Sequence, residues 1–137
     1  MPEKRSVIVG FRGWQDGEPS RSELRGELYR LRSGWALTYR EGPDENGTET
    51  SNTLFVRELE IQLRRRGAIL FEQAFRRGER LPGRMETPYG RHEVQAYTTS
   101  LDSSLSAAGG HIDWTYDLLM QDQKAGSFRI RLDIREE

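Results

Sequence analysis

Two histidines and a few acidic side chains are the groups in this sequence that could bind a metal. His92 and His111 lie near the starts of two expected strands, and Glu86 or Asp113 could add a carboxylate to a divalent-metal site. No third histidine and no helical histidine spacing supports such a site. The chain has no cysteine, which excludes a thiolate nucleophile and a cysteine-based metal site. We therefore expect neither a bound metal nor a cofactor.

The same inspection gives little support for catalysis. A hydrolase or isomerase would need Tyr39, His92 and Glu86 within about 3–4 Å of each other. The chain has no Gly-x-Ser-x-Gly elbow and no glycine-rich phosphate loop. Asp113 and Asp117 alternate with inward positions and should face solvent, which argues against a glycosidase-like carboxylate pair. We assign no catalytic residue, and the interpretation leans away from an enzyme.

The elements that must position these side chains are strands. Apolar residues recur at every second position in Leu59/Ile61/Leu63, Ile69/Phe71/Phe75, Ile112/Trp114/Tyr116/Leu118/Met120 and Phe128/Ile130/Leu132/Ile134. Because successive side chains of a strand point to opposite faces, this period predicts strands with one buried face. No amphipathic helix of three turns is visible. The sequence predicts one all-β domain over residues 1–137, a single antiparallel β-barrel of eight to ten strands with little or no helix.

Turn signals divide the chain into its expected strands. These cover residues 6–14, 23–32, 35–40, 52–57, 58–65, 68–76, 79–87, 92–99, 110–121 and 127–135, where 52–57 and 58–65 form either one bent strand or two strands across a bulge. Residues 15–22 are expected to form a polar loop, and residues 102–109 a loop of small residues. The Gly- and Pro-containing segment 41–50 is the strongest break in the pattern and the expected mobile loop.

Composition restricts the partners. Of 137 residues, 34% are hydrophobic and 31% charged, which suits a one-layer barrel better than a helical bundle. The net charge is −1, and the nine arginines between residues 57 and 91 are accompanied by five glutamates that can form cross-strand ion pairs with them, so we expect no nucleic-acid partner. No segment approaches the ~20 apolar residues of a membrane span, and the N-terminal apolar run is too short for a signal peptide. We expect no membrane partner and a cytoplasmic location.

A set of Gly, Pro and aromatic positions extends over most of the chain. They are Glu27-Leu28-Tyr29, Trp35-Ala36-Leu37-Thr38-Tyr39-Arg40-Glu41, Thr53-Leu54, Arg66-Gly67-Ala68, Phe75, Gly78, Glu86-Thr87-Pro88-Tyr89-Gly90, Ile112, Tyr116 and the final Phe-x-Ile-x-Leu-x-Ile. In these positions the chain resembles the YwiB-like family of uncharacterised bacterial proteins. The resemblance implies a calycin-like β-barrel, the architecture of lipocalins and fatty-acid-binding proteins. It implies no activity, catalytic residue or cofactor, and a fold does not by itself carry a function.

The first functional hypothesis is a non-catalytic barrel that binds a small, partly apolar ligand. Polar and aromatic side chains at inward or rim positions would line the site: Trp35, Tyr39, Phe71, Gln73, Glu86, Tyr89, His92, Trp114 and Tyr116. Buried polar groups need partners, which a ligand, trapped water or one another could supply.

The alternative hypothesis is a filled barrel that acts through its outer surface. A protein-interaction or homodimerisation module would use an outer sheet face or an edge strand, with Tyr29, Leu31 and Tyr97 in the contact. Interior volume separates the two hypotheses. A cavity of several hundred Å³ favours ligand binding, whereas a close-packed core favours the interaction module.

Overall fold

A computed structural model describes residues 3–137, which fold into ten strands. The strands are β1 (Glu3–Gln15), β2 (Glu18–Leu31), β3 (Gly34–Glu41), β4 (Thr50–Val56), β5 (Ile61–Arg66), β6 (Leu70–Phe75), β7 (Arg80–Thr87), β8 (Gly90–Ser106), β9 (Gly109–Met120) and β10 (Gln123–Glu136). Over this range no helix is long and apolar enough to span a membrane.

Each strand pairs antiparallel with the next one in the sequence, and β10 pairs with β1 to close the barrel. The all-β class and the single antiparallel barrel predicted from the sequence are confirmed. Ten strands is the upper end of the expected number. Tight turns make this topology possible, such as the two-residue turn at Asp16–Gly17, where both residues have positive φ.

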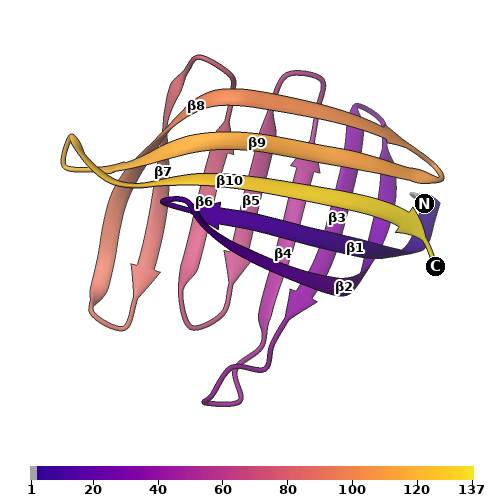
Figure 1. Cartoon of the computed structure of the whole chain (residues 1–137), viewed down its shortest axis with the longest axis horizontal. Helices are drawn as coiled ribbons and strands as arrows, with labels where there is room; N and C mark the ends of the chain where they lie inside the picture. Colours follow the sequence, from indigo (N-terminus) through magenta and orange to yellow (C-terminus); the bar gives the residue numbers. More distant parts are fainter. Residues whose placement is uncertain (1–2) are drawn as a thin grey trace.

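The barrel is flattened into two layers whose strands cross (Figure 1). Strands β3 to β7 form the rear layer, and β1, β9 and β10 lie in the front layer with the long strands β2 and β8. These two strands belong to both layers, because β2 pairs with β1 and β3, and β8 pairs with β7 and β9. The β8 ladder to β9 shifts register between Thr98 and Ser100, where the strand turns from one layer to the other.

Inward-facing side chains fill the space between the layers. The fully buried ones include Trp114, Phe75, Leu28, Leu37, Leu54, Ile61, Ile112 and Leu132. The Phe75 ring lies 5.6 Å from that of Trp114 and 4.6 Å from that of Tyr116, centroid to centroid. These aromatic contacts connect β6 in the rear layer to β9 in the front layer and form the centre of the core.

Several local expectations were wrong. The predicted polar loop over residues 15–22 is a two-residue turn, and β2 begins at Glu18 because strand pairing with β1 continues through polar, exposed residues. The predicted loop over residues 102–109 is the end of β8, where the ladder to β9 gives small residues an extended backbone. Leu59 lies in the β4–β5 turn and Ile69 in the β5–β6 turn, both exposed, although their spacing predicted burial.

Candidate functional site

The predicted ligand-lining residues divide into buried, half-buried and exposed groups. Tyr39, Phe71, Gln73, Trp114 and Tyr116 are buried and packed within the barrel, as their inward parity predicts. Four buried side-chain atoms in residues 3–137 have no hydrogen-bond partner: Asn52 Oδ1, Gln73 Oε1, Thr98 Oγ1 and Trp114 Nε1. Around these atoms, buried apolar side chains from nine of the ten strands form one continuous cluster in the barrel interior.

Gln73 has a structural role in the gap between β6 and β7. Its Nε2 donates to the carbonyls of Ala74 at 2.8 Å, Leu81 at 3.0 Å and Pro82 at 3.3 Å. The side chain lies over Gly83, where a Cβ would overlap with Gln73 Oε1. The amide thus replaces ladder hydrogen bonds at the point where direct β6–β7 pairing ends, at Gln73 opposite Gly83.

A polar cluster lies at the lower end of the barrel and consists of Tyr39, Glu41, Asn52, Arg65 and Tyr116. Arg65 Nη1 lies 3.2 Å from Glu41 Oε2, and Asn52 Nδ2 donates to the same oxygen at 2.9 Å. Burial raises the pKa of Tyr39 and of Tyr116 well above the ordinary tyrosine value, and the positive charge of Arg65 opposes that shift in both. Both phenols stay neutral at physiological pH.

The remaining candidates do not join this cluster. Glu86 lies on β7, with its Oε1 2.7 Å from Nε of Arg91, and Tyr89 in the β7–β8 turn is 96% exposed. His92 is half-buried and pairs across the ladder with Met85. Among residues 3–137 no hydrogen bond links Tyr39, His92 and Glu86.

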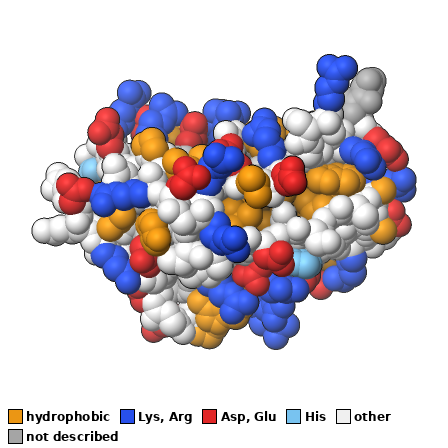
Figure 2. Space-filling view, turned by 90° about the horizontal axis from the view of Figure 1, so that it is seen from above, with side chains coloured by type: hydrophobic (Ala, Val, Ile, Leu, Met, Phe, Trp, Pro, Cys, Tyr) orange, Lys and Arg blue, Asp and Glu red, His pale blue; other side chains and the backbone are white. Residues whose placement is uncertain are grey.

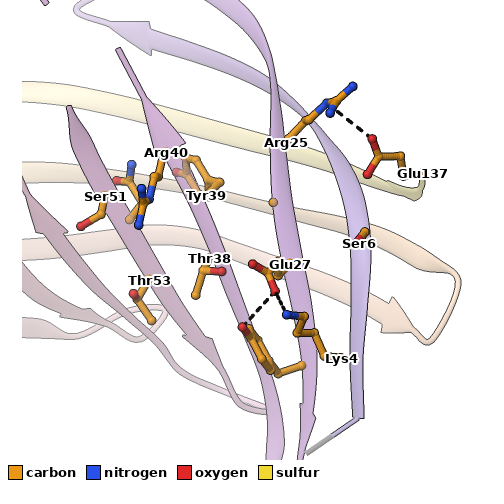
Figure 3. Close-up of a pocket in the computed structure, with 13 residues that line it drawn as sticks. Lys4, Ser6, Arg25, Glu27, Thr38, Tyr39, Arg40, Ser51, Thr53 and Glu137 are labelled. Carbon is orange, nitrogen blue, oxygen red and sulfur yellow. Dashed lines mark hydrogen bonds and ion pairs between the residues drawn. The ribbon is translucent and has the colours of Figure 1, made fainter. Parts of the chain in front are cut away.

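A hollow of about 590 Å³ lies on the outer face of β1 to β4 (Figure 3). Its basic side chains form ion pairs with acidic ones: Lys4 Nζ lies 2.8 Å from Glu27 Oε2, and Arg25 Nε lies 3.4 Å from Glu137 Oε1. Tyr29 also donates to Glu27, at 3.2 Å. Because these pairs satisfy one another, this surface offers little uncompensated charge to a ligand.

A second hollow, of about 530 Å³, opens at the upper end of the barrel; we call it the Trp35 groove. It is lined by Arg32, Ser33, Gly34, Trp35, Val56, Arg57, Glu58, Ser103 and Leu105. The view from above shows hydrophobic side chains in a depression on this end, with charged groups around it (Figure 2). The groove thus combines an apolar floor with a polar border, the usual composition of a small-molecule site.

The local backbone explains how the groove forms. Gly34 has φ of 145°, and a Cβ there would overlap with the carbonyl oxygen of Val56. The β2–β3 turn can therefore lie directly against the end of β4, which places Arg32 near Arg57. Trp35 follows at an inward position and remains half-buried at the floor.

The electrostatics of the Trp35 groove favour an anion. The Cζ atom of Arg30 lies 5.4 Å from the centroid of the Trp35 ring, a cation–π contact. Arg30, Arg32 and Arg57 have no carboxylate within 4.0 Å in residues 3–137, and Glu58 is the single acidic residue in the lining.

Sequence reasoning found one residue of this groove, Trp35, and missed the others. Arg32 and Arg57 belong to different turns, so only the strand register brings them together. Leu105 was placed in a loop, although the alternation Leu101, Ser103, Leu105 carried a strand signal. Among residues 3–137 no group of three His, Asp or Glu side chains could hold a metal ion.

The structure thus defines a small, closed, up-and-down antiparallel β-barrel with a groove at one end. A family model described as "Domain of unknown function (DUF1934)" matches residues 11–132, and the chain belongs to this family. Its backbone is similar to the crystal structure of the ywiB protein from Bacillus subtilis, with a TM-score of 0.82 and 20% sequence identity over 99% of this chain and 95% of that one. The predicted YwiB-like membership is confirmed. The search of curated proteins found no match.

Proposed function

We propose that the protein is a non-catalytic binding protein whose Trp35 groove takes a small, partly apolar molecule carrying an acidic group. This proposal keeps the ligand class expected from the sequence and moves the site from the barrel interior to its upper end. One observation carries it: an apolar floor formed by Trp35, Val56 and Leu105 lies next to the guanidinium groups of Arg32 and Arg57, which form no ion pair with any described residue.

The chemistry of the groove accounts for both parts of the ligand. Apolar ligand atoms on Trp35 and Leu105 would remove apolar surface from water, which stabilises a complex by ~25 cal/mol per Å². An anionic group at the border would accept charge-assisted hydrogen bonds from Arg32 and Arg57. A neutral analogue of the same shape would lose the second contribution.

The test is a titration with matched pairs of alkyl or aryl carboxylates and their primary amides, followed by melting temperature and tryptophan fluorescence. A carboxylate present at 100 times its Kd should add about 2.7 kcal/mol of stability, roughly 10 °C in Tm for a domain of this size. The amides should shift Tm less. If no carboxylate changes either signal, the proposal is wrong.

Variants locate the site. Arg57→Gln should weaken carboxylate binding about tenfold, since a charged hydrogen bond contributes about 1.5 kcal/mol. Arg66→Gln removes another exposed arginine, one that forms no ion pair among the residues described and lies at the other end of the barrel, so this variant should bind normally. Trp35→Phe should remove the fluorescence response. A response that survives in Trp35→Phe and disappears in Trp114→Phe would place the ligand inside the barrel and contradict the groove.

A further inference from the structure

Within residues 3–137, the two strands that belong to both layers each have a length that pairs with a neighbour on one side only: residues 100–106 of β8, and the first part of β2. Strand β2 pairs with β1 over residues 18–30, whereas its pairing with β3 begins only at Gly26. Residues 18–25 therefore have a free edge, and β2 forms the lower border of the front layer in Figure 1. Residues 18–23 are all exposed to solvent. An unpaired edge of this kind is a template for another strand.

The hairpin geometry determines which backbone groups lie along that edge. Gln15 and Glu18 flank the two-residue turn and form a hydrogen-bonded pair, so Glu18, Ser20, Ser22 and Leu24 direct their backbone groups toward β1. The alternate residues Pro19, Arg21, Glu23 and Arg25 direct theirs to the free side. Pro19, which has no N–H to leave unpaired, falls on that side, as expected for an edge strand.

No carboxylate in the part of the chain that the structure describes pairs with Arg21. Its direct partner across the ladder is Arg12, and Arg12 already donates to Asp133 at 3.1 Å. Like charges opposite each other on a sheet are unfavourable. No carboxylate lies within 4.0 Å of the Arg21 guanidinium in residues 3–137, which leaves its free side as the place where a carboxylate could act.

We propose that a second copy of the chain pairs with this edge, antiparallel, with Ser22 on the two-fold axis. Arg21 then lies opposite Glu23 of the second copy, and Glu23 opposite its Arg21. All of these residues direct their backbone N–H and C=O groups to the free side, so each pair exchanges both hydrogen bonds. The N–H of each Arg25 also meets a carbonyl of Pro19.

Neighbouring registers are excluded by charge. The backbone alternation allows only shifts that keep the edge-directed residues opposite one another. A two-fold axis on residue 21 places Arg21 opposite itself, and one on residue 23 places Glu23 opposite itself and Arg21 opposite Arg25. An axis on residue 24 would place Arg21 of the second copy opposite Glu27. That position is excluded because Glu27 already pairs with Thr38 of β3. Of the registers centred on residues 21 to 24, the Ser22-centred pairing is the one that places opposite charges across from each other and stays on the free edge of β2.

The contact is small and polar, so the dimer should be weak. Interfaces below ~1,200 Å² are typically transient, and we expect a dissociation constant on the order of 10–100 µM that weakens with salt. Association would join the two front layers into one continuous sheet and leave the Trp35 groove of each copy free, so this inference is independent of the proposed ligand.

Sedimentation equilibrium over a wide concentration range tests the pairing, with charge reversals as the discriminating variants. Arg21→Glu makes residues 21 and 23 both acidic, and Glu23→Arg makes both basic, so each variant alone should lose at least tenfold in dimer affinity. An equal mixture of the two should dimerise again, because each acidic strand then faces a basic one. Arg77→Glu, in the β6–β7 turn, is the control and should dimerise like the natural chain.

Circular dichroism and melting temperature establish that each variant is folded before its dimerisation is measured by sedimentation. The proposal is overturned if the natural chain stays monomeric at millimolar concentration, if either single reversal dimerises normally, or if the mixture of reversals stays monomeric. Glu23 also lies 3.4 Å from Arg135, and both side chains are well exposed, so the Glu23→Arg change should cost little stability.

Discussion

Replacement of Gly83 by alanine tests whether Gln73 acts as a structural plug between β6 and β7. A Cβ at position 83 would overlap with Gln73 Oε1 and lie 2.7 Å from its Cδ and 2.8 Å from the carbonyl oxygen of Glu72. Because Gln73 is buried and held by three carbonyls, it cannot move away freely. Overpacking of this kind typically costs 1–3 kcal/mol, and we expect Gly83→Ala to cost about 2 kcal/mol.

The energetic coupling between Gln73 and Gly83 in a double-mutant cycle tests this interpretation more sharply than the single Gly83→Ala variant does. Gln73→Ala should cost about 2–4 kcal/mol, because it removes buried volume and leaves the carbonyls of Ala74 and Leu81 without their donor. It also removes most of the steric conflict with a methyl group at position 83. In the Gln73→Ala background the Gly83→Ala cost should fall to about 1 kcal/mol, set by the remaining Glu72 carbonyl.

Urea unfolding followed by tryptophan fluorescence gives the four free energies of this cycle. Gly10→Ala is the matched control, because a Cβ at this strand glycine meets only Asp133 O at 3.6 Å and Asp133 Cβ at 3.9 Å. It should be neutral or stabilise by about 0.5 kcal/mol. If the costs of Gly83→Ala and Gln73→Ala simply add, within about 0.5 kcal/mol, the plug interpretation fails.

Two further predictions concern ionisable groups. Hydrogen bonds from Arg129 and Arg131 hold the pKa of Asp113 below its ordinary value, so its stabilisation is complete above the unfolded pKa near 3.8 and disappears as pH falls through the folded one. Asp113→Asn should therefore cost about 1 kcal/mol at pH 7 and almost nothing at pH 2, in urea titrations at both values. Burial raises the pKa of Tyr39 and Tyr116, so their stabilisation is present below pH ~10 and disappears above it. Two tyrosines should ionise only as the protein unfolds in alkali, and this step should be absent from the ultraviolet titration of a Tyr39→Phe/Tyr116→Phe variant that remains folded.

The sequence was sufficient for the architecture because alternation is strong where one face is buried. The series Ile112, Trp114, Tyr116 and Leu118 predicted the inward face of β9, and all four are buried. The same rule failed at Leu59, where a turn interrupts the strand. It also failed in β8 beyond residue 101, because small polar residues form a strand there only through pairing with β9.

The grouping of candidate side chains was less predictable, because it depends on register between strands. Asn52 and Arg65 occupy inward positions in phase with Leu54 and Leu63, a parity signal that could have identified the lower polar cluster. Arg32 and Arg57 carry no comparable signal, since turn residues have no fixed face. Their juxtaposition follows from the close approach of Gly34 to Val56, which no local pattern encodes.

Closure of the barrel between β1 and β10 has a consequence for how the chain folds. Val7 pairs with Glu136, and the N–H of Glu137 donates to Ser6 O at 3.1 Å, so the last ladder joins segments more than a hundred residues apart. Such distant pairing is slow because loop-closure entropy opposes it until most other contacts exist. A circular permutant that links residues 137 and 3 through a short connector and opens the exposed loop at residues 45–46 would make this ladder a local hairpin. The ladder that joins the two ends of the chain would then be the one between β3 and β4. The native strand pairs would stay the same, but the order in which they form during folding would change.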